Sequence, residues 1–342
     1  MTYARNVWYV AGWEMDLAVD TPMAITILNQ PLVIWRDGAG DVHALEDRCV
    51  HRHAPLSLGR CEGANLRCMY HGLLFGPDGV VSEIPGQEKI PPQARVRAYP
   101  VMVRHSWIWV WMGDPSLADV ALIPPAVGYD DGDYILGHGQ LDYDAPARLI
   151  NDNLLDFSHL TYVHAASFQA GPVFAQSLPV IEPLARGVRI SRWTQNTPAQ
   201  RARSAPELYD NYMCYDFLLP GVLLMWSASY AVGTAVALDF GVPDKGAALT
   251  GLNHTSQAVT PMSDGTARYF FNWGPHRAHG DVAMRDGMMA LAAQAFAEDK
   301  VMIEAQAKVI ARDPSRPIMP TAHDRAVTLF NRLVERMVAQ EA

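Results

Sequence analysis

Two pairs of cysteine and histidine stand out for the chemistry they could support, Cys49 with His51 and Cys68 with His71. The pairs lie in RCVHRHAPLSLG and RCMYHGLLFGPDG, two segments rich in turn-forming residues. Such loops let side chains converge on one point. A Rieske [2Fe–2S] cluster is held by two thiolates on one iron and two imidazoles on the other. The spacing therefore predicts a Rieske cluster bound by these four residues.

A structural zinc site is the alternative use of the same residue types. Common zinc sites pair cysteine with cysteine and histidine with histidine a few residues apart, whereas each pair here mixes the two types. We favour the iron–sulfur cluster on that ground. Cys61, Cys214 and His53 have no partner at a recognisable ligand spacing, and we predict structural roles for them.

A second group of potential metal ligands lies in NDNLLDFSHLTYVH, residues 151–164. Asp156 and His159 are three residues apart and would share a helical face. His159 and His164 lie about 140° apart on an ideal helix, so they converge only near a helix end or a distortion. Two imidazoles and one carboxylate form the facial triad that binds Fe(II) in oxygenases. Hydrogen-bonded structural histidines are the alternative.

The carboxylate of such a triad must come from elsewhere in the chain. Asp299 falls within an apolar helical stripe made of Ala292, Ala295, Phe296, Met302 and Ile303. Glu298 and Glu304 turn about 100° and about 140° away from it, toward the polar side. A buried carboxylate is costly unless it is paired or metal-bound. The pattern leaves both possibilities for Asp299 open, a metal ligand or the partner of an Arg or Lys.

The elements that must position these residues differ along the chain. The first hundred or so residues are short runs rich in Val, Ile, Trp and Tyr, which are typical of a small all-β domain. Residues 113–126 contain three prolines and are predicted to be a linker. Beyond it we expect a helix over 147–164, strands over 180–275, and helices over 282–312 and from 322 to the end. The sequence predicts an α+β protein with domains 1–115 and 116–342.

Composition excludes several classes of function. The 342 residues carry a formal net charge of −9 and no basic block, which argues against a nucleic-acid partner. Residues 217–238 are uncharged and long enough for a membrane span, but Pro220, Gly221 and Gly233 interrupt them. We therefore expect two buried strands with a turn there, and no membrane association. Without a signal peptide at the N-terminus, and with only four cysteines, we expect a cytoplasmic protein.

Taken together, these motifs resemble the oxygenase components of Rieske non-haem iron monooxygenases. Within that family the chain resembles vanillate O-demethylase, toluenesulfonate methyl-monooxygenase and dicamba O-demethylase. The resemblance covers essentially the whole chain. It rests on NVWYVAGW, CVHRHAPLSLGRCEG, CMYHGLLFGPDG, VSEIPGQEKIPP, WIWVWMGDPSLAD, DNLLDFSHLTYVHAASF, HTSQAVTP and AFAEDKVMIEAQ.

The resemblance implies a fold and a set of roles. It implies that a helix-grip catalytic domain, which is an antiparallel sheet with a long helix, follows the Rieske domain in the chain. His159, His164 and Asp299 would bind a mononuclear Fe(II), with Asn153 beside it. Asp156 would bridge His159 of its own subunit to His71 of a neighbouring subunit. The family forms head-to-tail homotrimers, so one subunit's cluster serves the next subunit's iron.

The expected function is O₂-dependent hydroxylation or O-demethylation of a small aromatic compound, expected to be an aromatic acid. Electrons must come from a separate NAD(P)H-dependent reductase or ferredoxin, because no flavin or nicotinamide fingerprint is present. Residues 168–251 match no close pattern, so the substrate stays open. Candidate substrate contacts are Asn253, His254, Gln257 and Trp226, with ordinary strand packing as their alternative. A Rieske electron-transfer or redox-sensing protein and a zinc-stapled binding protein are the competing functions.

Overall fold

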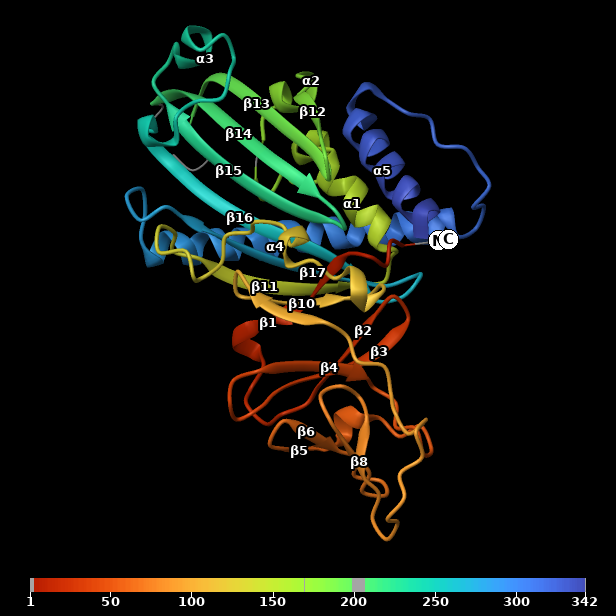
Figure 1. Ribbon diagram of the computed structural model, residues 1–342. Coiled ribbons are helices and arrows are strands. Elements are labelled where there is room, and N and C mark those ends of the chain that lie inside the picture. Colours follow the sequence, from red (N-terminus) through yellow and green to blue (C-terminus); the bar gives the residue numbers. More distant parts are fainter. Residues whose placement is uncertain (1–2, 169, 199–206, 342) are drawn as a thin grey trace. The chain divides into compact units, whose positions relative to one another are not determined.

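The structure is a computed structural model that describes residues 3–168, 170–198 and 207–341 (Figure 1). Its chain divides into two compact units. Unit 1 consists of Met1–Ile123 with Thr260–Asp264 and Glu341–Ala342. Unit 2 consists of Pro124–Val259 and Gly265–Gln340.

Unit 1 is built from three small sheets of antiparallel strands, which confirms the predicted all-β N-terminal domain. The first sheet has the order β1 (Trp8–Trp13), β10 (Trp107–Trp111), β9 (Val101–Arg104). The second runs β2 (Met23–Ile27), β3 (Gln30–Arg36), β4 (Val42–Glu46). The third runs β5 (Arg60–Glu62), β6 (Asn65–Arg67), β7 (Leu74–Phe75), β8 (Val81–Glu83).

Four short 3₁₀-helices occupy connections of this unit, η1 (Glu14–Asp16), η2 (Leu56–Leu58), η3 (Pro115–Leu117) and η4 (Val120–Leu122). The predicted linker 113–126 contains η3 and η4 and no strand. Asp114 and Asp119 cap these two helices, since each carboxylate accepts a hydrogen bond from a main-chain N–H two residues later.

Unit 2 contains a seven-stranded sheet with α4 (Val282–Ile310) lying along one face (Figure 1). The order is β11 (Gly137–Tyr143), β17 (Ala267–Pro275), β16 (Thr250–Pro261), β15 (Val222–Tyr230), β14 (Leu208–Leu218), β13 (Gly187–Pro198), β12 (Val180–Leu184). Phe296 of α4 packs its ring on Tyr269 and Phe271 of β17, with centroids 5.1 and 4.7 Å apart. This sheet with a long helix is the expected second domain, and the predicted helix 282–312 is confirmed to within two residues.

Shorter elements complete unit 2. They are α1 (Ala147–Leu155), η5 (Phe157–Thr161), α2 (Pro172–Gln176), α3 (Thr234–Ala237), η6 (Lys245–Ala247), η7 (Ala322–Asp324) and α5 (Arg325–Glu341). The predicted single helix over 147–164 is wrong. Its backbone leaves the helical conformation at Asp156, where φ is −127° and ψ is 95°, and the Asp156 carboxylate caps η5 instead.

The uncharged segment 217–238 forms the end of β14, a turn and β15, as predicted, and its last residues form α3. Among the described residues, no helix combines the length and apolar character needed to cross a membrane.

The register of the sheet assigns its side chains to two faces, because neighbours along a strand point to opposite sides. Tyr215 pairs with Met225, and Met225 pairs with Thr255, so these three share the face that α1, η5 and α4 cover. The ring of Phe157 in η5 lies 4.7 Å from that of Tyr215 on this face. We call the side of the sheet that carries Tyr215, Met225 and Thr255 the helix face.

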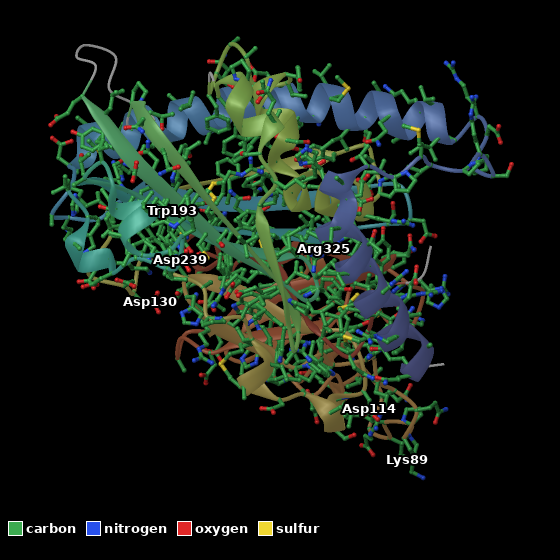
Figure 2. The ribbon with its side chains drawn as sticks, turned by 90° about the horizontal axis from the view of Figure 1, so that it is seen from above. Lys89, Asp114, Asp130, Trp193, Asp239 and Arg325 are labelled. Carbon is green, nitrogen blue, oxygen red and sulfur yellow. The ribbon has the colours of Figure 1, made fainter. Side chains whose placement is uncertain are left out.

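The opposite face carries Cys214, Trp226 and His254, which also pair in one row across the strands. The segment 231–249 covers part of it. Trp193 of β13 donates its indole N–H to the carbonyl of Gly241 at 3.0 Å, and Figure 2 labels Trp193 beside Asp239 of this segment. We call the side of the sheet that carries Cys214, Trp226 and His254 the loop face.

Candidate metal centres

Three side chains of unit 2 converge at the helix face. The ligand atoms of His159, His164 and Asp299 all lie within 4.8 Å of one another. Asp299 Oδ1 is 3.6 Å from His159 Nε2 and 3.2 Å from His164 Nε2. Among the described residues, the ion-pair partners of Asp299 are these two histidines, not an arginine or a lysine. Two imidazoles and a buried carboxylate at this spacing are a donor set that suits Fe(II).

The break at Asp156 explains how two histidines five residues apart can meet. Since α1 ends at Leu155 and η5 begins at Phe157, His159 and His164 do not lie on one ideal helix. The Nδ1 atom of His159 lies 2.6 Å from the carbonyl oxygen of Asp156. A carbonyl only accepts, so Nδ1 carries the hydrogen and Nε2 presents its lone pair toward Asp299 and His164.

His164 is held by a different partner. Its Nδ1 lies 2.8 Å from Oε2 of Glu298, the residue that precedes Asp299 on α4. Glu298 also accepts hydrogen bonds from the Ser167 hydroxyl at 2.6 Å and from Gln294 Nε2 at 3.1 Å. Helical periodicity places Glu298 on the polar side of α4, so its contact with His164 is not predicted from the sequence. Its position beside Asp299 was the only available signal.

Asn153 and Asp156 both lie at the site, but they contact it in different ways. The amide nitrogen Nδ2 of Asn153 is 3.1 Å from Asp299 Oδ1 and 3.5 Å from His159 Nε2. The expected bond between Asp156 and His159 exists, but the main-chain carbonyl of Asp156 makes it. The Asp156 carboxylate instead accepts from the main-chain N–H of Ser158 at 2.9 Å.

The electrostatics of the group favour a positive charge between its members. Burial opposes the charged form of His164, yet hydrogen bonds and charges from Asp299 and Glu298 outweigh it and raise the pKa of His164. Burial lowers the pKa of His159, and this effect exceeds the opposing influence of Asp299. A divalent metal ion would supply the positive charge while both histidines stay neutral. The residues therefore fit a mononuclear metal ion.

The four ligands predicted in unit 1 occupy two turns of nearly identical geometry. The carbonyl of Cys49 accepts from the N–H of His53, and the carbonyl of Cys68 accepts from the N–H of Gly72, both at 2.9 Å. His53 and Gly72 hold equivalent positions and both have positive φ, 58° and 79°. The two cysteines are therefore placed by matching backbone turns.

The cysteines and histidines of these turns differ in exposure. Cys49 and Cys68 are each 1% exposed within the core of the unit, and Cys49 shares a hydrogen bond with Cys68. His51 and His71 are exposed, and their ring centroids lie 4.4 Å apart. A thiol pair inside and an imidazole pair outside fit a Rieske cluster with its histidine end at the surface. Cys61 and Cys214 join neither group, in agreement with the structural roles predicted for them.

The four predicted substrate contacts are not brought together. Trp226 and His254 lie on the loop face, so the sheet separates them from His159, His164 and Asp299. Asn253 lies on the helix face, where it bonds Trp273, Ser227 and the Gly251 carbonyl. Gln257 is buried there between Tyr269 and Thr255. A cavity of about 290 Å³ is lined by Trp226, Cys214, Asp216 and Lys245 among others, and we assign it no role because these side chains belong to the loop face.

Comparison with known proteins agrees with these two centres. Residues 7–100 match the Rieske [2Fe-2S] domain, and residues 143–340 match the vanillate O-demethylase oxygenase C-terminal domain. The toluene-4-sulfonate monooxygenase system iron-sulfur subunit of Comamonas testosteroni is 36% identical over 99% of this chain and 98% of its own. The chain belongs to the Rieske oxygenase family of vanillate O-demethylase.

Solved structures of this family share the fold. Dicamba monooxygenase bound to dicamba superposes with a TM-score of 0.87 at 30% identity, covering 100% of this chain and 99% of that one. Dicamba monooxygenase with non-heme iron and dicamba gives a TM-score of 0.81 at 28% identity and the same coverage. The Rieske oxygenase described here is therefore an oxidoreductase, the oxygenase component of a monooxygenase.

Proposed function

We propose that this oxygenase inserts one oxygen atom into a C–H bond of a small aromatic acid, using a cluster on Cys49, His51, Cys68 and His71 and a mononuclear iron on His159, His164 and Asp299. The observation that carries the proposal is the convergence of the last three residues within 4.8 Å. When bound, the cluster supplies electrons singly and the mononuclear iron supplies a site for O₂.

The residues of the chain have distinct parts in this proposal. The Asp156 carbonyl and the Glu298 carboxylate orient the two imidazoles through their Nδ1 atoms. Asn153 donates to Asp299 and so fixes one carboxylate oxygen of the triad. The Asp156 carboxylate bridges to His71 of a neighbouring subunit in a homotrimer. We place the cluster domain at 1–115 and the catalytic domain at 116–342.

The overall reaction balances with O₂, two electrons and two protons, which yield one hydroxylated carbon and one water. On a methoxy methyl group the product is a hemiacetal, which collapses to a phenol and formaldehyde. On an aryl methyl group the product is an alcohol. An anionic aromatic substrate is supported by the names of relatives, which include toluene-4-sulfonate and vanillate. A separate NAD(P)H-dependent reductase or ferredoxin would supply the electrons.

Two other functions are less well supported. An electron-transfer or redox-sensing protein needs only the first centre, and the buried His159, His164 and Asp299 group would then have no use. A zinc-stapled binding protein would not need a buried thiol pair beneath an exposed imidazole pair. We also propose a cytoplasmic location, supported by four cysteines that form no disulfide.

The test is turnover of a defined substrate panel by the purified protein with a surrogate reductase. Methoxybenzoates and toluenesulfonates are supplied with NADH and O₂, and formaldehyde and hydroxylated products are measured. We expect His159→Ala to lose mononuclear iron and product while it retains the cluster's visible spectrum. Normal product formation by His159→Ala, or a colourless wild type containing stoichiometric zinc, would refute the proposal.

A further inference from the structure

The two candidate histidine ligands are oriented by different kinds of hydrogen-bond acceptor. His159 uses a main-chain carbonyl, whose position follows from the backbone. His164 uses the side-chain carboxylate of Glu298. The first bond cannot be removed by changing a side chain, whereas the second can. A carboxylate partner also makes an imidazole a more basic ligand than a neutral carbonyl does.

His164 has almost no freedom in this arrangement. Its side chain is 1% exposed, and both of its ring nitrogens face carboxylates. The Glu298 carboxylate is the nearer partner, at 2.8 Å from Nδ1, whereas Asp299 is 3.2 Å from Nε2, so the hydrogen on neutral His164 resides on Nδ1, toward Glu298. The lone pair of Nε2 then points toward Asp299 and His159. Glu298 therefore selects the tautomer that metal binding requires.

Glu298 is itself fixed in place. Buried Ser167 donates its hydroxyl to Oε2, and Gln294, one helical turn earlier, donates to Oε1. Both carboxylate oxygens thus have partners besides His164. Because Glu298 and Asp299 are consecutive on α4, the helix contacts one imidazole through two adjacent side chains. Glu298 lies at Nδ1 and Asp299 at Nε2.

We propose that Glu298 is a positioning residue for the mononuclear metal, acting through His164. This inference rests on the proposed function, since it assigns a role at the same site. Its carboxylate fixes the tautomer and the ring angle of His164, and Ser167 and Gln294 hold the carboxylate. Residues of this kind typically change metal affinity about 10- to 100-fold when they are removed.

The test compares metal binding, not only activity, in Glu298→Ala, Glu298→Gln and Ser167→Ala. The dissociation constant for Fe(II) is measured by competition with a ferrous chelator, with the cluster's visible spectrum as the control for folding. Co(II) is then bound in place of Fe(II), and its ligand-field spectrum reports the geometry of the site. Glu304→Gln is the matched control, because Glu304 lies on the same helix and is partly buried, with Asp144 and Lys300 as partners.

We expect Glu298→Ala to raise the dissociation constant about 10- to 100-fold and to alter the cobalt spectrum. Glu298→Gln should have a smaller effect, since its amide oxygen still accepts from Nδ1 but carries no charge. Ser167→Ala should also weaken binding, and Glu304→Gln should match the wild type. If Glu298→Ala does not fold, the other two variants carry the same test.

Unchanged affinity and an unchanged cobalt spectrum in the Glu298 variants would overturn the inference, as would an equal loss in Glu304→Gln. Failure of the proposed function gives a different result, because the wild type itself would then bind no mononuclear iron.

Discussion

Asp156 combines a backbone role and a side-chain role that can be separated by substitution. Its carbonyl orients His159, and its carboxylate caps η5 through Ser158. Asp156→Asn keeps the carbonyl and an amide oxygen that can still cap, but it removes the negative charge. The variant therefore isolates the charge on which the proposed bridge to a neighbouring cluster depends.

We expect Asp156→Asn to retain both metal centres and to lower the single-turnover rate about 10- to 100-fold, the effect of losing a hydrogen bond to a charged group. Iron content, the cluster spectrum and product formed in one turnover check this. Asp152→Asn is the control, because Asp152 lies on α1, which ends just before Asp156, and it bonds Asn331 of α5. An unchanged rate in Asp156→Asn would count against the bridge.

His254 should make the protein's stability depend on pH. Burial, with a smaller contribution from Lys245, lowers the pKa of His254 to about 3. The unfolded chain takes up this proton near pH 6.5, while the folded protein does not until near pH 3. Folding is thus disfavoured as the pH falls between these values. Uptake of this one proton by the unfolded chain lowers the free energy of unfolding by roughly 1.4 kcal/mol per pH unit in this range.

The variant His254→Phe keeps an aromatic ring beside Tyr134, whose centroid is 5.5 Å away, but cannot be protonated. Both proteins share the metal centres, so their difference in unfolding free energy isolates His254. Denaturant unfolding at pH 7.5 and pH 5.5 should show a smaller acid-induced loss in the variant. Parallel losses in the two proteins would contradict the assignment.

At the residue scale, residue type and spacing indicated the candidate metal ligands more clearly than the groups that orient them. Cysteine and histidine are uncommon enough that Cys49, His51, Cys68 and His71 are visible from spacing. Glu298 was missed because helical periodicity gives a direction but not a partner. Residue type alone did not show that Trp226 and His254 lie on the opposite face of the sheet from Thr255, because the register that fixes a strand's faces depends on pairing with distant strands.

Among the elements, α4 is the one on which the site most depends. Its core-facing Phe296 packs on Tyr269 and Phe271 one turn before Asp299, while its N-terminus is capped by Asp281 through the N–H of Met284. Packing and capping can therefore be compared on a single helix.

We expect Phe296→Ala to destabilise unit 2 by about 3–5 kcal/mol, because it removes a buried aromatic ring. Asp281→Ala should cost about 1 kcal/mol, the usual value for a lost N-cap. Urea unfolding followed by tryptophan fluorescence measures both. Equal effects of the two substitutions would mean that packing does not dominate the stability of α4.

The elements themselves were largely predictable, and the exception is informative. Short runs rich in Val, Ile, Trp and Tyr, bounded by turn residues, predicted strands in both units, and the long apolar stripe predicted α4. The break after Leu155 was not predicted, since no proline or glycine marks it. It arises where the Asp156 side chain caps a new turn, and the same residue types also occur inside helices.

At the scale of the whole molecule, the proposed homotrimer can be tested by its mass and by the activity of mixed trimers. The holoenzyme should sediment at about three times the 37.7 kDa chain mass, as expected for a closed ring. Activity should also require the cluster of one subunit and the mononuclear iron of the next subunit. A Cys68→Ser chain lacks the cluster, and a His159→Ala chain lacks the mononuclear iron, so each should be inactive alone.

Trimers refolded or co-expressed from a mixture of these two chains should regain part of the activity, because an intact cluster of one subunit then faces an intact iron site of the next. Product formation by mixed and unmixed trimers measures this. A mixture as inactive as its components would show that cluster and iron must reside in the same chain.

The two cluster turns of unit 1 are alike in geometry but not in their tolerance of substitution. His53 occupies a left-handed backbone conformation that costs a non-glycine residue roughly 1–2 kcal/mol, whereas Gly72 occupies the equivalent position without that cost. A Cβ atom on Gly72 would lie 2.8 Å from Cγ of Pro85. A side chain at residue 53 therefore meets only the backbone cost, whereas a side chain at residue 72 would also have to displace Pro85. The two halves of one cluster site have unequal freedom to change.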